Sequence, residues 1–374
     1  MSMPQTIKNT FTPLMTYLQE IYDPRDQKKI KYLLSEVVFI ALAGLLSGQD
    51  DWVAIESYGK SRNRWLKKYF KLKCGIPSHD TFGHVFALID PQELINALGK
   101  WLNNLISLPE QDIINIDGKL IESYSAADPF CLLKAWSSKM KIVLNQVKVP
   151  AYTNEIKAIP SLLDLIDIKG NIVTIDAIGA QKAIIKKICD KDGYYVIALK
   201  ANQHRFYKDI KDYLISLANN EFDIPFSYHE TINKSHGRTE IRRCWSIDQL
   251  DWLEQKSEWT GLKSIILVET EIIYRGKTTI NRRFFISNLN SDATKFLHVI
   301  RSHWSIENQL HWHLDVTFHE DHSRVKDRFG IQNLSFLRAV AISLLSKIMK
   351  NLGFKRKRQI VNYRPSLLKK ILLN

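Results

Sequence analysis

Cysteine is scarce in this chain of 374 residues, and its four copies are scattered. Cys74, Cys131, Cys189 and Cys244 form no C-x-x-C pair, which argues against a cysteine zinc site. Their spacing also gives no sign of a disulfide framework. The sequence contains no internal repeat and no low-complexity segment.

Long hydrophobic runs are also missing. The longest, VVFIALAGLL at 37–46, is about half of the roughly 20 residues that a membrane helix needs. We therefore expect it to form a buried core helix. The N-terminus lacks the basic-then-apolar pattern of a signal peptide. The sequence thus predicts a cytoplasmic protein with no membrane partner.

Positive charge, in contrast, is abundant. The net charge is +14 and the isoelectric point is near 9.4, which favours a polyanionic partner such as nucleic acid. Residues 346–374 contain no acidic residue at all, so we interpret them as a basic tail that contacts nucleic acid. The alternatives are a merely basic, soluble chain and a solvated, disordered end.

The pattern of elements divides the chain into three parts. Residues 1–110 read as a helical N-terminal domain, with helical patterns at 33–46, 52–69 and 91–108 and a helix start at Ser78. In residues 111–345, strands at 113–118, 139–149, 170–179 and 193–200 alternate with helices at 155–166 and 181–189. This alternation predicts an α/β core, a mixed sheet flanked by helices. A β-rich insertion of hairpins at about 226–290, the second turning at Arg275-Gly276, and a helix at 331–350 precede the tail.

The stretch RSHWSIENQLHWHLD at 301–315 suggests zinc at first, because it holds three histidines. The zinc-protease pattern H-E-x-x-H fails here, since Trp304 follows His303. On a helix, one face would carry His303, Glu307, His311 and Asp315, while Ile306, Leu310 and Leu314 would form a neighbouring apolar stripe. Whether Glu307 is a metal ligand depends on carboxylates elsewhere in the chain.

Two aspartates supply those carboxylates. Asp117 and Asp176 each follow an apolar strand, at the end where open α/β sheets bind ligands. Each of them alone is as well explained as a turn or helix cap. Together with Glu307 they can hold two Mg²⁺ ions about 4 Å apart, which clamp the attacking and leaving oxygens of a phosphodiester. The predicted chemistry is metal-assisted phosphoryl transfer on a polynucleotide.

Several longer blocks carry a family resemblance. The segments NIDGK, NEIKAIPSLLDLIDIKGNIVTIDAIGAQK, YVIALKANQ, SHGRTEIR and RSHWSIENQLHWHLDVTFHED occur in this order. They resemble the H-repeat-associated family of insertion-sequence transposases, over roughly residues 15–345. These enzymes belong to the DDE class, whose catalytic core has a ribonuclease-H-like fold. The resemblance implies DNA cleavage and strand transfer at the ends of the enzyme's own element, which is DNA-mediated transposition and recombination.

Carried over position by position, the resemblance makes Asp117, Asp176 and Glu307 the catalytic and metal-binding residues, with Asp315 in reserve. It implies two Mg²⁺ ions, for which Mn²⁺ can substitute. It also implies double-stranded DNA as partner, a homodimer on DNA and a nucleoid-associated bacterial protein. The residues expected to contact DNA are Lys119, Lys200, Asn202, Gln203, Arg301, His303, His311 and Arg324, with His303 and His311 open to a supporting role beside the metal ligands.

The sequence departs from the family at several positions. Related enzymes often have tyrosine, arginine and lysine where this chain has Ile300, His303 and Leu314. Glu122 replaces a common arginine, and Cys131 replaces a histidine. These departures keep open a catalytically weakened copy that only binds DNA. A nuclease or resolvase without joining activity is a third possibility, although it would need neither the insertion nor the N-terminal domain.

Overall fold

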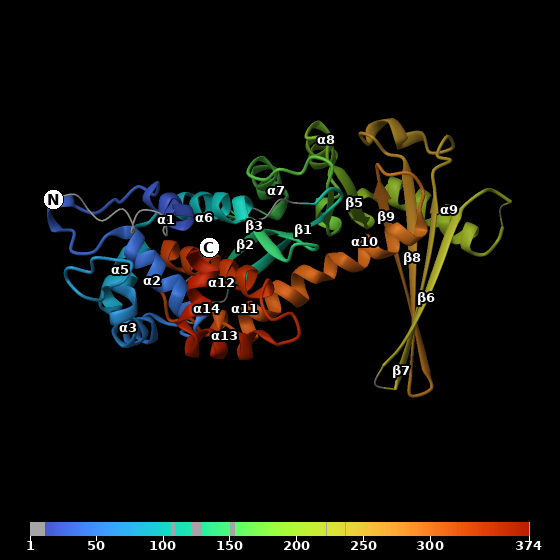
Figure 1. The fold of residues 1–374 in the computed structure, drawn as a ribbon. Helices are drawn as coiled ribbons and strands as arrows, with labels where there is room; N and C mark the ends of the chain where they lie inside the picture. Colours follow the sequence, from blue (N-terminus) through green and yellow to red (C-terminus); the bar gives the residue numbers. More distant parts are fainter. Residues whose placement is uncertain are drawn as a thin grey trace.

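A nine-stranded mixed sheet forms the centre of the molecule (Figure 1). The computed structural model describes residues 12–105, 109–121, 129–149, 154–221, 223–235 and 237–373. The strand order is β3-β2-β1-β4-β5-β9-β8-β7-β6, with β1–β4 and β4–β5 parallel and all other pairs antiparallel. The strands are β1 (Ile113–Ile121), β2 (Phe130–Ser137), β3 (Ile142–Lys148), β4 (Ile172–Ile175), β5 (Tyr194–Leu199), β6 (Ser227–Ser235), β7 (Arg238–Ile247), β8 (Ser264–Tyr274) and β9 (Lys277–Ser287).

Helices cover both faces of this sheet, as the alternation of strands and helices predicts. Helices α7 (Glu155–Asp164), α8 (Lys182–Asp190) and α9 (His204–Ala218) pack on the face that carries Ile114 and Val173. Helix α10 (Ala293–Ile306) packs on the opposite face, on Ile113 and Ile172. Because successive side chains of a strand point to opposite faces, each strand contributes to both cores. The predicted mixed sheet with flanking helices is confirmed, although β2 and α9 were not predicted from the sequence.

The N-terminal helices do not have a core of their own. They are α1 (Thr12–Gln19), α2 (Leu34–Leu46), α3 (Trp52–Ser61), α4 (Asn63–Leu66), α5 (His79–Leu88) and α6 (Pro91–Leu105). Their buried residues form one hydrophobic cluster with those of α12 (Arg328–Ser346), α13 (Phe354–Tyr363) and α14 (Pro365–Leu373). All of α2 is buried, as expected of the run at 37–46. Ser78 caps α5, because its hydroxyl accepts a hydrogen bond from the Thr81 N–H.

The basic C-terminal segment is folded, which argues against the alternative of a disordered, solvated end. Its helices α13 and α14 pack against α2 and α12, and Lys357 and Arg358 are buried. The Arg358 guanidinium donates hydrogen bonds to the carbonyl of Leu45 and to the carboxylate of Asp50. Within the described residues, α12 is the one helix with the length and hydropathy of a membrane span, and 89% of that span is buried inside the protein.

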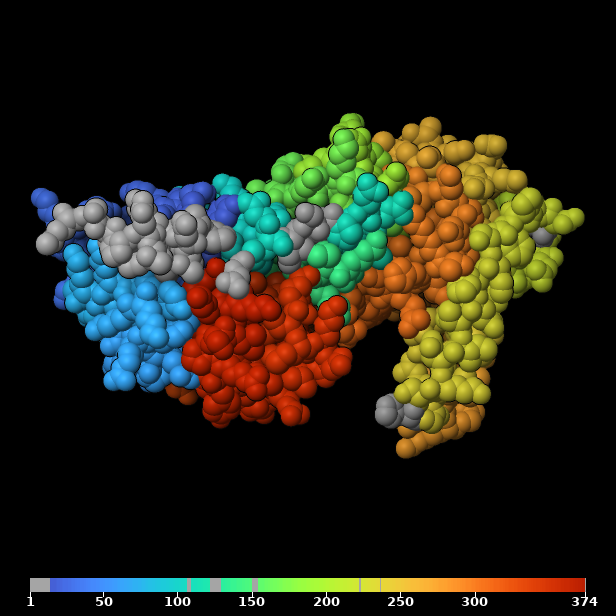
Figure 2. All heavy atoms as spheres, in the orientation of Figure 1, coloured from blue at the N-terminus to red at the C-terminus, as the bar shows by residue number. Residues whose placement is uncertain are grey.

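Strands β6–β9 form an arm that projects from the body (Figures 1 and 2). The two hairpins begin inside the central sheet, because β9 pairs with β5, and their far ends extend away from it. The second hairpin turns at Arg275 and Gly276, both with positive φ, as predicted. Figure 2 shows an open gap between the arm and the C-terminal helices. The hairpins thus extend the sheet and do not form a separate layer.

Candidate active site

The strand register places two of the predicted acids side by side. Ile116 of β1 pairs with Ile175 of β4 in the parallel ladder, so the next residues, Asp117 and Asp176, lie opposite each other. β4 ends at this point, whereas β1 continues to Ile121 in its pairing with β2. Asp176 also caps a short turn, since its carboxylate accepts a hydrogen bond from the Ile178 N–H at 3.0 Å. Both carboxylates therefore lie at the edge of the sheet where β4 ends.

The third acid lies at a break in the helix geometry. Helix α10 ends at Ile306, and a π-helical turn, Glu307–His311, joins it to α11 (Trp312–Val316). A π-turn inserts one extra residue and often marks a functional site. The predicted apolar stripe of Ile306, Leu310 and Leu314 is fully buried, as expected. Because of the extra residue, the predicted polar face is not continuous. The side chains of His303 and Glu307 point to one side of the helix, and those of the polar residues after them point to another.

All three predicted acids line one cavity. Its volume is about 470 Å³, and it lies between the ends of β1 and β4, the base of the arm and α10. The polar side chains in its wall are those of Asp117, Thr174, Asp176, Lys200, Tyr207, Asn281, Arg282, Arg283, His303, Trp304 and Glu307. Residues from six separate segments of the chain therefore meet in one space.

A buried polar network ties α10 to the two strands. The Asn115 amide donates hydrogen bonds to the carbonyl of Ser302 and the hydroxyl of Ser305. The Thr174 hydroxyl donates to Asn115 at 2.7 Å and lies 2.9 Å from His303 Nδ1. Asn115 and Thr174 each stand two residues before an aspartate, hence on the same face of the strand as that aspartate.

This network fixes the helix that carries Glu307 against the strands of Asp117 and Asp176. The roles of Asn115 and Thr174 were not predicted from the sequence. The signal was present, because INID and VTID each place a polar residue inside an otherwise apolar strand.

The three acids lie close enough for their charges to act on one another. Burial, followed by the charges of Glu307, Glu155 and Asp176, raises the pKa of Asp117 to about 7. Burial lowers the pKa of His303 to about 4, so this histidine is neutral at pH 7. Burial also lowers the pKa of His311 to about 3. Neither histidine therefore offsets the carboxylates.

A divalent cation fits this donor set. In the described part of the chain, no three His, Cys, Asp or Glu side chains stand close enough to form a ready ligand group. The cavity nevertheless collects carboxylate oxygens, the hard ligands that Mg²⁺ and Mn²⁺ prefer. Burial and then repulsion from neighbouring carboxylates raise the pKa of Asp117, and a cation would relieve the repulsion. Asp117, Asp176 and Glu307 are the residues that would hold it.

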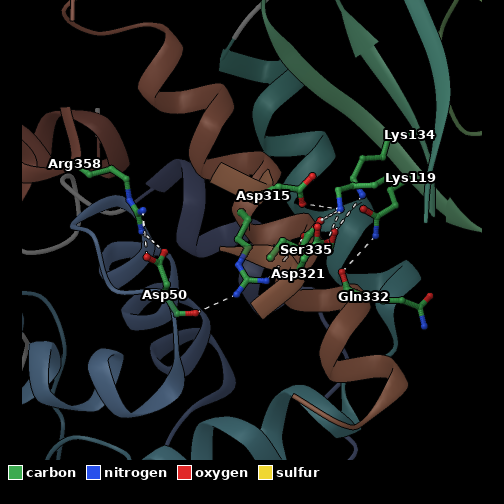
Figure 3. Close-up of polar contacts among 11 residues, drawn as sticks. Asp50, Lys119, Lys134, Asp315, Asp321, Gln332, Ser335 and Arg358 are labelled. Atoms are coloured by element: carbon green, nitrogen blue, oxygen red, sulfur yellow. Dashed lines mark hydrogen bonds and ion pairs between the residues drawn. The ribbon is translucent and has the colours of Figure 1, made fainter. Parts of the chain in front are cut away.

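Two residues expected to contact DNA are turned into the protein instead. Lys119 is buried, and its ammonium group lies 2.8 Å from Asp315, 3.0 Å from Asp321 and 3.5 Å from Glu320 (Figure 3). His311 is also buried, with its Nδ1 3.5 Å from the carboxylate of Asp117. Neither side chain is exposed for DNA contact in this structure, and His311 takes the position beside Asp117 that the sequence analysis left open for it.

Asp315, the reserve candidate for a metal ligand, does not line the cavity of the three acids. Its carboxylate pairs with Lys119 in a buried network of ion pairs and hydrogen bonds (Figure 3). In the same network, fully buried Lys134 donates a hydrogen bond to the Ser335 hydroxyl at 3.1 Å. The network connects β1 and β2 with α12, and it is a structural feature that sequence patterns alone did not indicate.

Five other residues expected to contact DNA lie in four different places. Lys200 is exposed and lines the cavity beside His303. Asn202 and Gln203 donate hydrogen bonds to the carbonyls of Ala177 and Ala180, both at 2.9 Å, and so hold the loop that follows Asp176. The remaining two are exposed: Arg301 lines a separate groove with His229 and His298, and Arg324 lies in the segment between α11 and α12. Glu122 lies outside the described residues.

Comparison with known families identifies related sequences. The family described as "Transposase DDE domain" matches residues 132–344, and the family described as "DDE_Tnp_1-associated" matches residues 15–102.

Similar proteins with transposase names cover nearly the whole chain. YncI of Escherichia coli O157:H7 is 35% identical over 96% of this chain and 94% of its own length. The H repeat-associated protein YhhI of Escherichia coli K12 is 35% identical over 92% of this chain and 93% of its own length. A solved structure, the piggyBac transposase synaptic complex with hairpin DNA, aligns with 99% of this chain and 82% of that chain, at 12% identity and a TM-score of 0.44.

Proposed function

Because the chain belongs to the family of transposases with a DDE domain, we propose that it cleaves DNA at the ends of an insertion sequence and joins them to target DNA. The main observation behind this proposal is that Asp117, Asp176 and Glu307 line the same cavity. Three separate segments of the chain supply these acids, and divalent ions held by such carboxylates can stabilise both the attacking and the leaving oxygen of a phosphodiester. The proposed partners are double-stranded DNA and, on DNA, a second copy of the chain.

The strand order supports a ribonuclease-H-like core. Five strands in the order β3-β2-β1-β4-β5, with β1, β4 and β5 parallel, form the part of the sheet that positions the aspartates. Helices on both faces complete an α/β core, and the β6–β9 arm extends it from β5. The proposed core places Asp117 and Asp176 on its central strands and Glu307 on the helix that covers them.

The chain's own groups suit a two-cation mechanism. Mg²⁺ or Mn²⁺ held by these carboxylates would supply activation of the attacking hydroxyl and stabilisation of the leaving oxygen. Asp117, whose pKa is raised to about 7, must give up its proton when a cation binds. Neutral His303 holds α10 to Thr174 and so keeps Glu307 in place. Exposed Lys200 and Arg283 in the cavity wall are placed to bind a phosphate.

The shape of the molecule supports a path for DNA. Residues 281–285 of β9 line the cavity, so the arm begins at the active site. The gap between the arm and the C-terminal helices is open in Figure 2. We propose that DNA lies in this gap and that the charge of +14 draws it there.

Cleavage of a labelled duplex tests the function. The duplex carries the DNA that flanks this coding region, which contains the ends of the element, and Mg²⁺ or Mn²⁺ is added. We expect metal-dependent nicks at the element boundary, and Glu307→Gln, Asp117→Ala or Asp176→Ala should reduce the rate by at least about a thousandfold, as removal of an essential catalytic group does. The same variants should still bind the duplex in a gel-shift assay.

The outcomes separate the alternatives. Metal-independent binding with no cleavage by the wild-type protein would identify a catalytically weakened, DNA-binding copy. Cleavage without strand transfer into a plasmid target would indicate a nuclease or resolvase. Near wild-type cleavage by one acid variant would remove that acid from the metal site.

A further inference from the structure

A fourth carboxylate lies next to the three that the family resemblance implies. Glu155 is the first residue of α7, and this helix packs on β2 and β3. Helix α10, which leads to Glu307, covers the opposite face of the sheet from α7. Asp117 and Asp176 therefore have Glu307 on one side and Glu155 on the other.

Gly118 shows how closely Glu155 approaches. A Cβ atom at position 118 would lie 2.0 Å from Glu155 Oε1 and 2.6 Å from its Cδ. Gly118 lies in β1 and does not have a positive φ, so backbone conformation does not explain the glycine. Gly118 follows Asp117 in β1, and its missing side chain gives room to the carboxylate of Glu155 on the face of the sheet that α7 covers.

Cys131 helps to hold Glu155 in this place. Its thiol donates a weak hydrogen bond to Glu155 Oε1, with a sulfur–oxygen distance of 3.4 Å. Burial, and then the charge of Asp176, raise the pKa of Glu155. The charge of Glu155 acts in turn on Asp117. The charge of Glu155 is thus coupled to those of Asp117 and Asp176, and each further carboxylate increases the repulsion.

We propose that Glu155 is a fourth carboxylate of the cation site, which it enters from α7 through the space left open by Gly118. The inference rests on the proposed function, because it needs a cation between Asp117 and Asp176. Mg²⁺ keeps several waters when it binds, so a carboxylate at this position contributes either directly or through one of those waters.

A purely structural role makes a different prediction. An acidic residue in the first turn of a helix interacts favourably with the helix dipole. If this were the role of Glu155, its neutralisation would lower the stability of the metal-free protein and leave metal binding unchanged. A carboxylate of the cation site should behave in the opposite way in both respects.

Thermal unfolding of the full-length protein separates the two roles. The melting temperature is measured without metal and over a Mn²⁺ titration for the wild type, Glu155→Gln and Asp117→Asn. We expect Glu155→Gln to raise the metal-free melting temperature, since repulsion is relieved, and to need about ten- to a hundredfold more Mn²⁺ for the same shift, as loss of a group that supports a metal site does. Asp80→Asn is the matched control, because Asp80 lies in the first turn of α5, exposed and in a different part of the chain.

Each outcome has a defined meaning. If Glu155→Gln responds to Mn²⁺ as the wild type does while Asp117→Asn has lost the response, the inference about Glu155 is overturned and the proposed function stands. If the wild type gives no Mn²⁺ response, both are overturned, because Glu155 then has no ion to hold. A lower metal-free melting temperature in Glu155→Gln, with an unchanged response, would assign Glu155 to the helix alone.

A second pair of variants gives an independent test. Gly118→Ala should force the carboxylate of Glu155 away and weaken the Mn²⁺ response. The same substitution in a Glu155→Ala background should have a much smaller effect, since the clash with Glu155 is gone and only Cys131, 2.8 Å from the new Cβ, has to move. Equal effects of Gly118→Ala in both backgrounds would contradict the inference.

Discussion

At the scale of single residues, the site depends on side chains that touch neither metal nor substrate. Asn202 and Gln203 hold the carbonyls of Ala177 and Ala180, and therefore the loop that starts at Asp176. Lys200, two residues earlier, is exposed in the cavity. We expected all three residues to contact DNA. In the structure, Asn202 and Gln203 position the loop, whereas Lys200 lies at the surface of the cavity.

Alanine variants should separate these roles. Asn202→Ala should reduce the cleavage rate by about ten- to a hundredfold, the usual effect of losing a group that orients a ligand, with DNA affinity nearly unchanged. Lys200→Ala should instead weaken DNA binding and lower the salt dependence of the affinity by about one unit of slope. Cleavage kinetics and filter binding over a salt series measure both. Loss of DNA affinity in Asn202→Ala would assign that side chain to DNA.

Lys134 offers a test of buried charge. Burial lowers the pKa of this lysine to about 8 from its usual 10.5. Between these two pH values the unfolded chain holds a proton that the folded protein has released, so the stability from this group rises as pH increases from 8 to 10.5. The rise should be on the order of 3 kcal/mol, from about 1.4 kcal/mol per pKa unit.

Urea unfolding of the wild type and Lys134→Met at several pH values between about 7.5 and 10.5 measures this effect. Other groups titrate in the same range, but both proteins share them, so the difference between the two profiles reports Lys134. We expect the gap in unfolding free energy to change with pH in favour of the wild type. Parallel profiles would mean that Lys134 titrates normally in the folded protein.

At the scale of elements, the π-helical turn determines which side chains face the cavity. One extra residue rotates everything after Glu307 by about 100° relative to a regular helix. His303 and Glu307 consequently line the cavity, while His311 is buried and Asp315 pairs with Lys119. A regular helical spacing in the sequence would place all four on one face.

Deletion of Asn308, an exposed residue within the turn, tests this interpretation. The shortened segment should form a continuous α-helix, in which Glu307 and the residues after the turn can no longer both keep their positions. We expect the helix content in circular dichroism and the DNA affinity to be close to wild type, with cleavage abolished. Replacement of Asn308 by alanine is the control and should retain cleavage. Wild-type cleavage by the deletion variant would contradict a role for the π-turn.

At the scale of the whole molecule, the C-terminal helices combine exposed basic side chains with apolar side chains that are buried in the core. Helices α13 and α14 bury Val361, Leu368, Leu372 and Leu373 in the core that they share with α2 and α12. Removal of residues 354–374 should therefore cost several kcal/mol, because each fully buried aliphatic side chain contributes about 1.5–3 kcal/mol. The truncated protein should unfold at a much lower temperature or be insoluble.

Substitution of exposed charges isolates the electrostatic part. Lys355, Arg356 and Lys370 lie on the surface of these helices, and their replacement by glutamine should leave the melting temperature within a few degrees of wild type. If this surface binds DNA, the salt dependence of the affinity should fall by about 0.9 for each phosphate that the variant no longer neutralises. Wild-type salt dependence in the triple variant would show that DNA binds elsewhere.

Local patterns in the sequence determined several elements of this fold. An apolar run with no charge becomes a buried helix wherever it lies, as α2 does, and Arg275-Gly276 between two strand-like segments makes a hairpin turn. The same holds for the alternation of strands and helices that produces the mixed sheet. The family resemblance, which covers most of the chain, identified the three acids that share the cavity.

The tertiary structure alone decided which charges are free. Lys119 and Lys200 look alike in the sequence, but Asp315, Glu320 and Asp321, about 200 residues away, surround only Lys119. Glu155 resembles an ordinary helix start in the sequence, but in the fold its carboxylate lies against Gly118 of β1, the residue after Asp117. The physical reason is that a charge depends on its solvation and on its neighbours in space, and contacts between distant segments set both.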